Sequence, residues 1–377
     1  MGAGQVWARI LMYGGRVVLA VGSYAAAFAL IPPRVGIIRI LVGFAAAMVL
    51  MQLWVRLLRR QVLVSVVREC LVAAPPERVW ALLSSAEAWS LRPGFHAFGV
   101  PPLEGMPPLL ATIRVHARGV TCSAQELIEL PRTAGQPGRS LLIRSATRPG
   151  SPASLTIRVA REGSGTRVVV TAQELARLAS VFDVEVAGRK VLTAWLDECA
   201  AVLAGDRDRP GQEMSPDVLA ALAAPLSAGD VTEASASVLI AVDPARAWEV
   251  VWDPATRLPG SNTVAAGFVP GRPVGQAGEI QYVISTSSQP DGALLLHLNY
   301  VCDMEPGRMA RTRISGPIHS EALYRIEPES DGTRLSLTYR FADPRLRKNK
   351  EKVQANVEKD ADNYKVLLEG TNTSHQS

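Results

Sequence analysis

A long internal repeat is the feature that most constrains how this chain folds. Two stretches, Leu71–Gly94 and Leu239–Gly260, echo each other at an offset of 168 positions, counted from Leu71 to Leu239. The matched positions are Leu71 with Leu239, Ala73 with Ala241, Pro76 with Pro244, Arg78 with Arg246, Trp80 with Trp248 and, after a two-residue gap, Pro93-Gly94 with Pro259-Gly260. A chain of 377 residues that repeats itself in this way is predicted to build one kind of domain twice.

Each repeat predicts the same order of elements: an apolar strand, a helix begun by proline with an inward tryptophan, and a short second helix ended by Pro-Gly. After the first unit, alternating patterns predict strands at 109–118, 124–130, 141–147, 155–161 and 167–171, then a helix over 178–204. After the second unit they predict strands at 279–285, 294–303, 309–315, 319–327 and 334–341, then a helix over 345–369. The segment between them reads as a linker with one short helix at 216–224.

This order of elements, with Pro76-x-x-x-Trp80 and Pro244-x-x-x-Trp248, resembles the SRPBCC superfamily of START-like and Bet v 1-like proteins. That superfamily includes polyketide cyclases and lipid-transfer proteins, and the resemblance covers 62–204 and 231–369. It implies an α+β fold of two tandem helix-grip domains, each a curved antiparallel sheet around a long C-terminal helix. It also implies a cavity between the sheet and the helix, which usually binds a hydrophobic ligand. The motif residues shape the first helices, so they mark fold rather than chemistry.

The first sixty residues contain two apolar runs, at 10–31 and 35–57, separated by Pro32-Pro33-Arg34. Each run is about 20 residues, the length that crosses a hydrocarbon core of roughly 30 Å, so a transmembrane helical hairpin is predicted. A cleaved signal peptide ending near residues 27–29 and a pair of buried core helices are the alternatives. The predicted domains are therefore 1–60 (hairpin), 61–204 (first START-like domain), 205–230 (linker), 231–370 (second START-like domain) and 371–377 (tail).

The net charge of +5 belongs to this N-terminal segment. Residues 1–60 hold seven arginines and no acid, so the rest of the chain carries −2, which is +5 minus +7. A nucleic-acid-binding domain concentrates basic residues on its folded surface, so a nucleic-acid partner is not expected. More arginines flank the outer ends of the two runs than the turn between them. The positive-inside rule then predicts a multi-pass protein of the inner membrane, in contact with its lipids, with the domains facing the cytoplasm.

Tyrosines mark the second domain as the candidate ligand binder. Five of the seven tyrosines lie there on predicted inner faces, and a buried tyrosine needs a partner for its hydroxyl. The predicted ligand-binding residues are Trp248, Tyr282, Leu298, Tyr300, Tyr324, Tyr339, Val357 and Tyr364. The alternative is that these are ordinary core tyrosines bonded to the backbone. The first domain has no tyrosine on its predicted inner faces, so its interior is expected to be apolar and its role structural or dimerising. A homodimer is one of the oligomeric states that this allows.

Catalytic signals are weak. His297 and Asn299 have the opposite strand parity to Tyr300 and are predicted to face outward, and His319 is either a turn residue or the mouth of a cavity. No histidine pair has metal-ligand spacing, and no G-x-S-x-G, P-loop or G-x-G-x-x-G motif is present, so no catalytic residue, metal or cofactor is predicted. The four cysteines are widely spaced and are expected to be free thiols.

These observations favour a membrane-anchored protein that binds, transfers or sequesters a hydrophobic small molecule: a lipid, quinone, isoprenoid or polyketide. An enzyme similar to the polyketide aromatase/cyclases is the first alternative, and it requires polar groups in the cavity to move protons. A non-enzymatic membrane scaffold is the second alternative.

Overall fold

The structure is a computed structural model. It describes residues 36–92, 95–103, 108–115, 122–129, 140–146, 151–206, 213–226, 231–257, 262–287, 292–316, 319–343 and 348–370, with Leu346 and positions 14, 15, 18, 21, 22, 25, 26 and 29. By contacts the chain divides into two compact units. Unit 1 comprises Met1–Pro76, Pro137–Leu142 and Ser151–Ala200, and unit 2 comprises Glu77–Gln136, Ile143–Gly150 and Ala201–Ser377.

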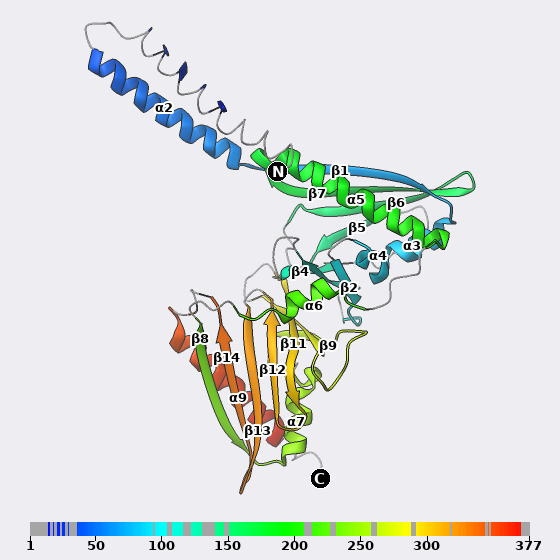
Figure 1. Cartoon of the computed structure of the whole chain (residues 1–377), viewed down its shortest axis with the longest axis vertical. Coiled ribbons are helices and arrows are strands. Elements are labelled where there is room, and N and C mark those ends of the chain that lie inside the picture. Colours follow the sequence, from blue (N-terminus) through cyan, green and yellow to red (C-terminus); the bar gives the residue numbers. More distant parts are fainter. Residues whose placement is uncertain are drawn as a thin grey trace. The chain divides into compact units, whose positions relative to one another are not determined.

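The repeat appears as two seven-stranded sheets with the same strand order (Figure 1). The first, in the order β1-β7-β6-β5-β4-β3-β2, consists of β1 (Gln61–Val72), β2 (Phe95–Gly99), β3 (Leu109–Val115), β4 (Cys122–Glu129), β5 (Ser140–Ser145), β6 (Ser154–Glu162) and β7 (Gly165–Arg177). The second, in the order β8-β14-β13-β12-β11-β10-β9, consists of β8 (Thr232–Ile240), β9 (Thr263–Phe268), β10 (Ile280–Thr286), β11 (Leu294–Glu305), β12 (Met309–Ser315), β13 (Ser320–Glu329) and β14 (Gly332–Phe341). The short edge strands β2 and β9 are absent from the sequence-based prediction.

The described helices follow the predicted order. They are α2 (Gly36–Arg59), α3 (Pro76–Leu83), α4 (Ala86–Ser90), the 3-10 turn η2 (Leu178–Ser180), α5 (Val181–Ala204), α6 (Pro216–Ala223), α7 (Pro244–Trp252), the 3-10 turn η3 (Pro254–Arg257) and α9 (Lys350–Gly370). The pairs α3/α4 and α7/η3 are the two short helical turns expected in each repeat, and α6 is the short helix expected in the linker.

A long helix packs against each sheet, which confirms the predicted α+β class with two sheet-and-helix units. In unit 2, α9 lies along β8 and β14 (Figure 1), and its Gln354 Nε2 and Lys365 Nζ donate to the carbonyls of Ser235 and Leu239, each at 2.8 Å. In unit 1, α5 approaches β1 so closely that a Cβ on Gly188 would lie 3.2 Å from the Val66 side chain. The buried residues of each helix form one stripe: Leu192, Trp195, Cys199 and Val202 on α5, and Val353, Val357, Ala361 and Leu368 on α9.

A duplicated hydrogen bond shows that the repeat extends beyond its first helices. Thr166 Oγ1 donates to the carbonyl of Ala74 at 2.5 Å, and Thr333 Oγ1 donates to the carbonyl of Val242 at 2.6 Å. The glycine before each threonine makes room for the preceding chain. A Cβ on Gly332, which has φ +145°, would lie 2.2 Å from the Ile240 carbonyl oxygen. The same buried side-chain bond thus ties the first strand of each sheet to the last.

The predicted membrane hairpin gains no support. The run at 10–31 lies, apart from a few positions, outside the described residues, and the run at 35–57 corresponds largely to α2. Among the residues that the structure describes, no helix meets the length and hydropathy needed to cross a membrane.

Candidate functional site

The candidate site is the face of the second sheet that packs against α7 and α9, called here the inner face. Its buried residues form one cluster, the inner cluster, drawn from β8, β11–β14, α7 and α9: Ala234, Ile240, Val242, Ala247, Val250, Val251, Trp252, Val301, Ala310, Ala322, Tyr324, Ile326, Leu335, Leu337, Val353, Val357, Ala361 and Leu368. The half-buried aromatic residues Trp248, Tyr339, Phe341 and Tyr364 pack against it. The interior is therefore apolar in bulk and lined by aromatic rings.

Helix α7 aims two tryptophans at this interior. Asp243 caps the helix by accepting a hydrogen bond from Arg246 N at 3.0 Å, and Pro244 occupies the first turn, where a missing N–H costs nothing. Trp248 and Trp252 are four residues apart and so share one face of the helix. Their rings stack with centroids 5.4 Å apart and planes at 5°.

An unbroken series of ring contacts continues from α7 across the sheet. The rings of Trp252 and Tyr324 meet edge to face at 6.2 Å and 86°, and those of Tyr324 and Tyr339 at 6.4 Å and 73°. Tyr339 then stacks on Phe341 at 6.1 Å and 11°. Such contacts orient the rings as well as bury them.

Tyrosine hydroxyls converge within this apolar interior. The hydroxyl oxygens of Tyr324 and Tyr339 lie 3.3 Å apart, within hydrogen-bond distance. Burial raises the pKa of Tyr339 well above its usual value, and the nearby Tyr324, Tyr364 and Asp360 raise it further. Tyr339 is therefore neutral at physiological pH, and its hydroxyl can both donate and accept a hydrogen bond.

The structure brings together five of the eight predicted ligand-binding residues. Trp248, Tyr324, Tyr339, Val357 and Tyr364 all belong to the inner cluster or pack against it. Tyr282 and Leu298 lie instead in a second buried cluster on the opposite, outer face of the sheet, and Tyr300 packs against that cluster. The predicted inward orientation of these three residues is wrong.

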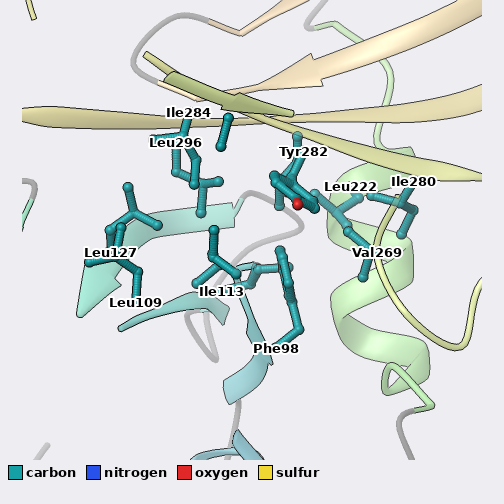
Figure 2. Close-up of a cluster of buried hydrophobic side chains, with 14 of the residues drawn as sticks. Phe98, Leu109, Ile113, Leu127, Leu222, Val269, Ile280, Tyr282, Ile284 and Leu296 are labelled. Atoms are coloured by element: carbon teal, nitrogen blue, oxygen red, sulfur yellow. The ribbon is translucent and has the colours of Figure 1, made fainter. Parts of the chain in front are cut away.

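The outer cluster explains their placement. It joins β9–β11 to β2–β4 and α6 within unit 2, and Figure 2 shows Tyr282, Ile284 and Leu296 facing Phe98, Ile113 and Leu127 across it. In the antiparallel pairing Tyr282 lies opposite Leu298 and Ile280 opposite Tyr300, so all four side chains share the outer face. Because these strands are covered on both faces, their apolar residues do not reveal which face points to α9.

Polar residues occupy the inner face of β10 and β11, where the sequence-based interpretation placed none. Gln281 is fully buried, and its Nε2 donates to the Trp252 carbonyl at 3.2 Å and to Glu279 Oε1 at 2.7 Å. Asn299 lies opposite Gln281 in the sheet and is 4% exposed. The prediction that Asn299 faces outward is therefore wrong. The signal that could have revealed this row is the spacing of two residues between polar positions, at Glu279 and Gln281 and at His297 and Asn299.

His297 continues this polar row and is half-buried on the inner face, so the prediction that it faces outward is also wrong. It is two residues from Asn299 and so shares its face, and burial lowers the pKa of its imidazole below the usual value. Its Nε2 lies 3.4 Å from Ser285 Oγ. A Cβ on Gly316 would lie 2.8 Å from His297 Nδ1, so the glycine makes room for the ring.

His319 lies at a small cavity beside α6, which is separate from the interior between the second sheet and α9 where a ligand cavity was predicted. The cavity has a volume of about 140 Å³ and lies between the segment after α6 and the adjoining ends of β12 and β13. Arg313, Ser315 and Ser320 line it with His319. Glu321 engages the Arg313 guanidinium at 3.4 Å, so this cation is already paired.

Cysteines and metal ligands add no reactive centre in the part of the chain that the structure describes. Cys70, Cys199 and Cys302 are free, as predicted, while the side chain of Cys122 lies outside the described residues. Burial raises the pKa of the Cys70 thiol to about 11 and that of Cys199 to about 12, so neither is a thiolate at neutral pH. Within the described residues, no three His, Cys, Asp or Glu side chains group as metal ligands.

Comparisons with known proteins identify similar folds but no family. No family model and no curated protein matches the chain. Among solved structures, the di-domain ARO/CYC StfQ from the steffimycin biosynthetic pathway has a TM-score of 0.31 at 13% identity, over 81% of this chain and 97% of StfQ. The di-domain ARO/CYC BexL from the BE-7585A biosynthetic pathway has 0.30 at 12% over 81% and 97%, and Ara h 8.0201 has 0.30 at 15% over 38% and 99%. At these scores the likeness carries no argument about function, which must come from the residues of this chain.

Proposed function

We propose that the inner face of the second sheet binds a hydrophobic small molecule: a lipid, quinone, isoprenoid or polyketide. The observation that carries the proposal is the convergence of the Tyr324 and Tyr339 hydroxyls inside an aromatic, apolar interior. Ligand sites are mostly apolar and aromatic, with a small number of placed polar groups. The two stacked tryptophans of α7 supply one wall, and α9 supplies the other.

The test is to introduce a larger side chain on the inner face of the sheet, so that it occupies the proposed ligand space. Ala322 is 1% exposed and lies opposite both Thr312 and Tyr339 in the sheet. Ala322→Leu adds apolar volume at this point. We expect the gently purified protein to carry a hydrophobic molecule by native mass spectrometry and solvent extraction, and Ala322→Leu to lose it while keeping its thermal midpoint within a few degrees.

The matched control is Val366→Leu on α9, where the side chain is 72% exposed. This variant is expected to retain the molecule. Recovery of ligand-free wild-type protein, or equal occupancy in both variants, overturns the proposal. A fixed protein partner recovered with ligand-free protein points instead to the scaffold function.

An enzyme similar to the polyketide aromatase/cyclases is a second candidate, and one observation favours it. Such chemistry needs polar groups that can orient a polyketone and move protons. Gln281, His297 and Asn299 supply such groups on the same face of the sheet as Tyr324. Turnover of a poly-β-ketone substrate that is lost in His297→Gln and Tyr324→Phe supports this function, whereas binding without turnover leaves only ligand binding.

Membrane attachment through the first sixty residues is a further part of the proposal, with the domains on the cytoplasmic side. On α2, Phe44, Val49 and Leu53 are 57%, 57% and 53% exposed, and Arg56 and Arg59 lie in the last turn. Exposed apolar surface of this kind marks a membrane or protein contact. Retention of the full chain in the membrane pellet after a carbonate wash is the expected result, and quantitative release contradicts attachment.

A further inference from the structure

Three buried polar atoms on or beside the inner face have no hydrogen-bond partner among the residues that the structure describes. They are Trp252 Nε1, Gln281 Oε1 and Thr312 Oγ1. Their residues are 6%, 0% and 1% exposed. Folding removes such groups from water. A group left without a hydrogen-bond partner then costs the protein its full desolvation free energy, so buried polar groups are nearly always paired. Three such atoms beside one apolar interior indicate a group of a ligand that pairs with them.

The positions of the three residues place these atoms at the same interior as the tyrosines. Thr312 lies opposite Val301 on one side and Ala322 on the other, and both partners belong to the inner cluster. Ala322 in turn lies opposite Tyr339, so a single alanine separates Thr312 from that tyrosine across the sheet. Gln281 adjoins Trp252 through its bond to the Trp252 carbonyl. Because cross-strand partners share a face, the hydroxyl of Thr312 is on the side of Tyr339.

The chemistry of the three atoms defines what they can pair with. Trp252 Nε1 is only a donor, Gln281 Oε1 is only an acceptor, and the Thr312 hydroxyl is both. The adjacent Glu279 carboxylate is already engaged, with Gly275 N at 2.5 Å and with Gln281 Nε2 at 2.7 Å. The neighbouring cations Arg311 and Arg313 lie on the other parity of β12 from Thr312 and ion-pair on that side or face solvent. Among the described residues, these cations therefore offer a carboxylate or phosphate group no counter-ion here, and such an anion would pay a large desolvation cost.

We propose that this part of the interior, Trp252, Gln281 and Thr312, binds a neutral oxygen-bearing group of the ligand, such as a hydroxyl or phenol. The inference rests on the proposed function and narrows it. The ligand is an apolar molecule with an uncharged group that both donates and accepts hydrogen bonds. A free fatty acid or a phosphorylated lipid headgroup does not fit this subsite.

The test uses three aromatic probes of one shape on the full-length protein: naphthalene, 1-naphthol and 1-naphthoate. Binding is followed by titration calorimetry at pH 7. We expect 1-naphthol to bind about tenfold more tightly than naphthalene, and 1-naphthoate to bind more weakly than either. Thr312→Val replaces the hydroxyl with a methyl group of similar size, so it is expected to abolish most of the preference for 1-naphthol and to leave naphthalene binding unchanged.

A second measurement separates an unpaired hydroxyl from a structural one. If Thr312 has no partner in the ligand-free protein, Thr312→Val raises the thermal midpoint of that protein, because an unsatisfied polar group is replaced by a methyl. The control is Thr338→Val on β14, whose hydroxyl accepts from Ser235 Oγ at 3.1 Å on the opposite face of the strand from Tyr339. That variant is expected to leave the binding of all three probes unchanged.

The outcomes distinguish the inference from the function on which it rests. Equal binding of naphthalene and 1-naphthol, or a preference that survives Thr312→Val, overturns the polar subsite and leaves hydrophobic binding intact. A lowered thermal midpoint in ligand-free Thr312→Val also overturns the subsite. Binding of none of the three probes contradicts the proposed function, and the subsite with it.

Discussion

The two faces of the second sheet are built from the same strands but carry different chemistry. On β10 and β11 the outer face presents Ile280, Tyr282, Ile284, Leu296 and Leu298 to a packed apolar cluster (Figure 2). The inner face of the same strands presents Gln281, His297 and Asn299. Because successive residues of a strand point to opposite faces, one strand can contribute to stability on one side and to recognition on the other. Changes on the outer face should therefore act on stability, and changes on the inner face on binding.

The largest effect is expected from truncating the outer face. Leu298 is fully buried in the outer cluster, so Leu298→Ala should lower the free energy of unfolding by about 2–5 kcal/mol. The binding of 1-naphthol to the protein that remains folded should be unchanged, because the side chain points away from α9. Chemical denaturation and calorimetry measure the two quantities. If the variant keeps its stability but no longer binds 1-naphthol, Leu298 contacts the ligand and its assignment to the outer face is wrong.

A pH effect is expected at the same cluster through His96. Burial, together with the nearby positive charge of Arg272, lowers the pKa of His96 to about 4. Its ring centroid lies 6.4 Å from that of Phe98, a residue of the outer cluster. Between pH 6.5 and 4, His96 is protonated in the unfolded chain but stays neutral in the folded protein. The free energy of unfolding therefore decreases as the pH falls through this window, by up to about 3 kcal/mol.

The control for this prediction is His96→Gln, which removes the titrating group. Urea unfolding at several pH values from 7 to 4 should give a flatter profile for the variant than for the wild type. Identical slopes would show that other groups account for the loss of stability in acid.

A smaller effect is expected from the close approach of β9 to β10. A Cβ on Gly267 would lie 2.8 Å from the Tyr282 hydroxyl oxygen, so Gly267→Ala should cost about 1–3 kcal/mol by overpacking. Adding Tyr282→Phe removes the obstructing oxygen and should recover part of the loss. A double-mutant cycle measures this coupling, and strict additivity of the two changes would contradict the contact.

The smallest effect on stability is expected from removing the Tyr339 hydroxyl on the inner face. Unlike the changes above, this one should also weaken ligand binding. Tyr339→Phe removes the partner of the Tyr324 hydroxyl and should change the free energy of unfolding by no more than about 1.5 kcal/mol. The affinity for 1-naphthol should fall severalfold. Tyr300→Phe, on the outer side, is the matched control and should bind as the wild type does. Equal effects of the two changes would remove the distinction between the faces.

The scaffold of the molecule was readily predictable because it rests on patterns that local physics enforces. Proline at the start of α3 and α7, alternation in the long strands and the apolar stripe of α9 each reflect a single dominant constraint. The edge strand β9, with the sequence TVAAGF, was missed because alanine and glycine have weak strand propensity. The other edge strand, β2, has only five residues and follows directly after Pro93-Gly94.

The candidate site was only partly predictable, and strand parity is the reason. Alternation identifies the buried face of a strand only when the other face meets water. On β13 and β14 the other face is partly exposed to water, and Tyr324 and Tyr339 were placed correctly in the interior. On β10 and β11 the outer face is buried and the inner face is buried or half-buried, and the pairing of β11 with β12 shifts register between Val301 and Asp303. Tyr282 and Tyr300 were therefore assigned to the wrong side, and Gln281 was overlooked.

The central claim is that a ligand lies against the inner face of the second sheet, between Thr312 and Tyr339. The most direct measurement is a crystal structure of the full-length protein saturated with 1-naphthol. The account predicts the naphthalene ring beside Trp252 and Tyr324, with its hydroxyl within hydrogen-bond distance of Thr312 Oγ1 or Gln281 Oε1. Electron density for the probe only in the cavity beside His319, or an inner face closed by its own side chains with the probe bound elsewhere, would contradict it.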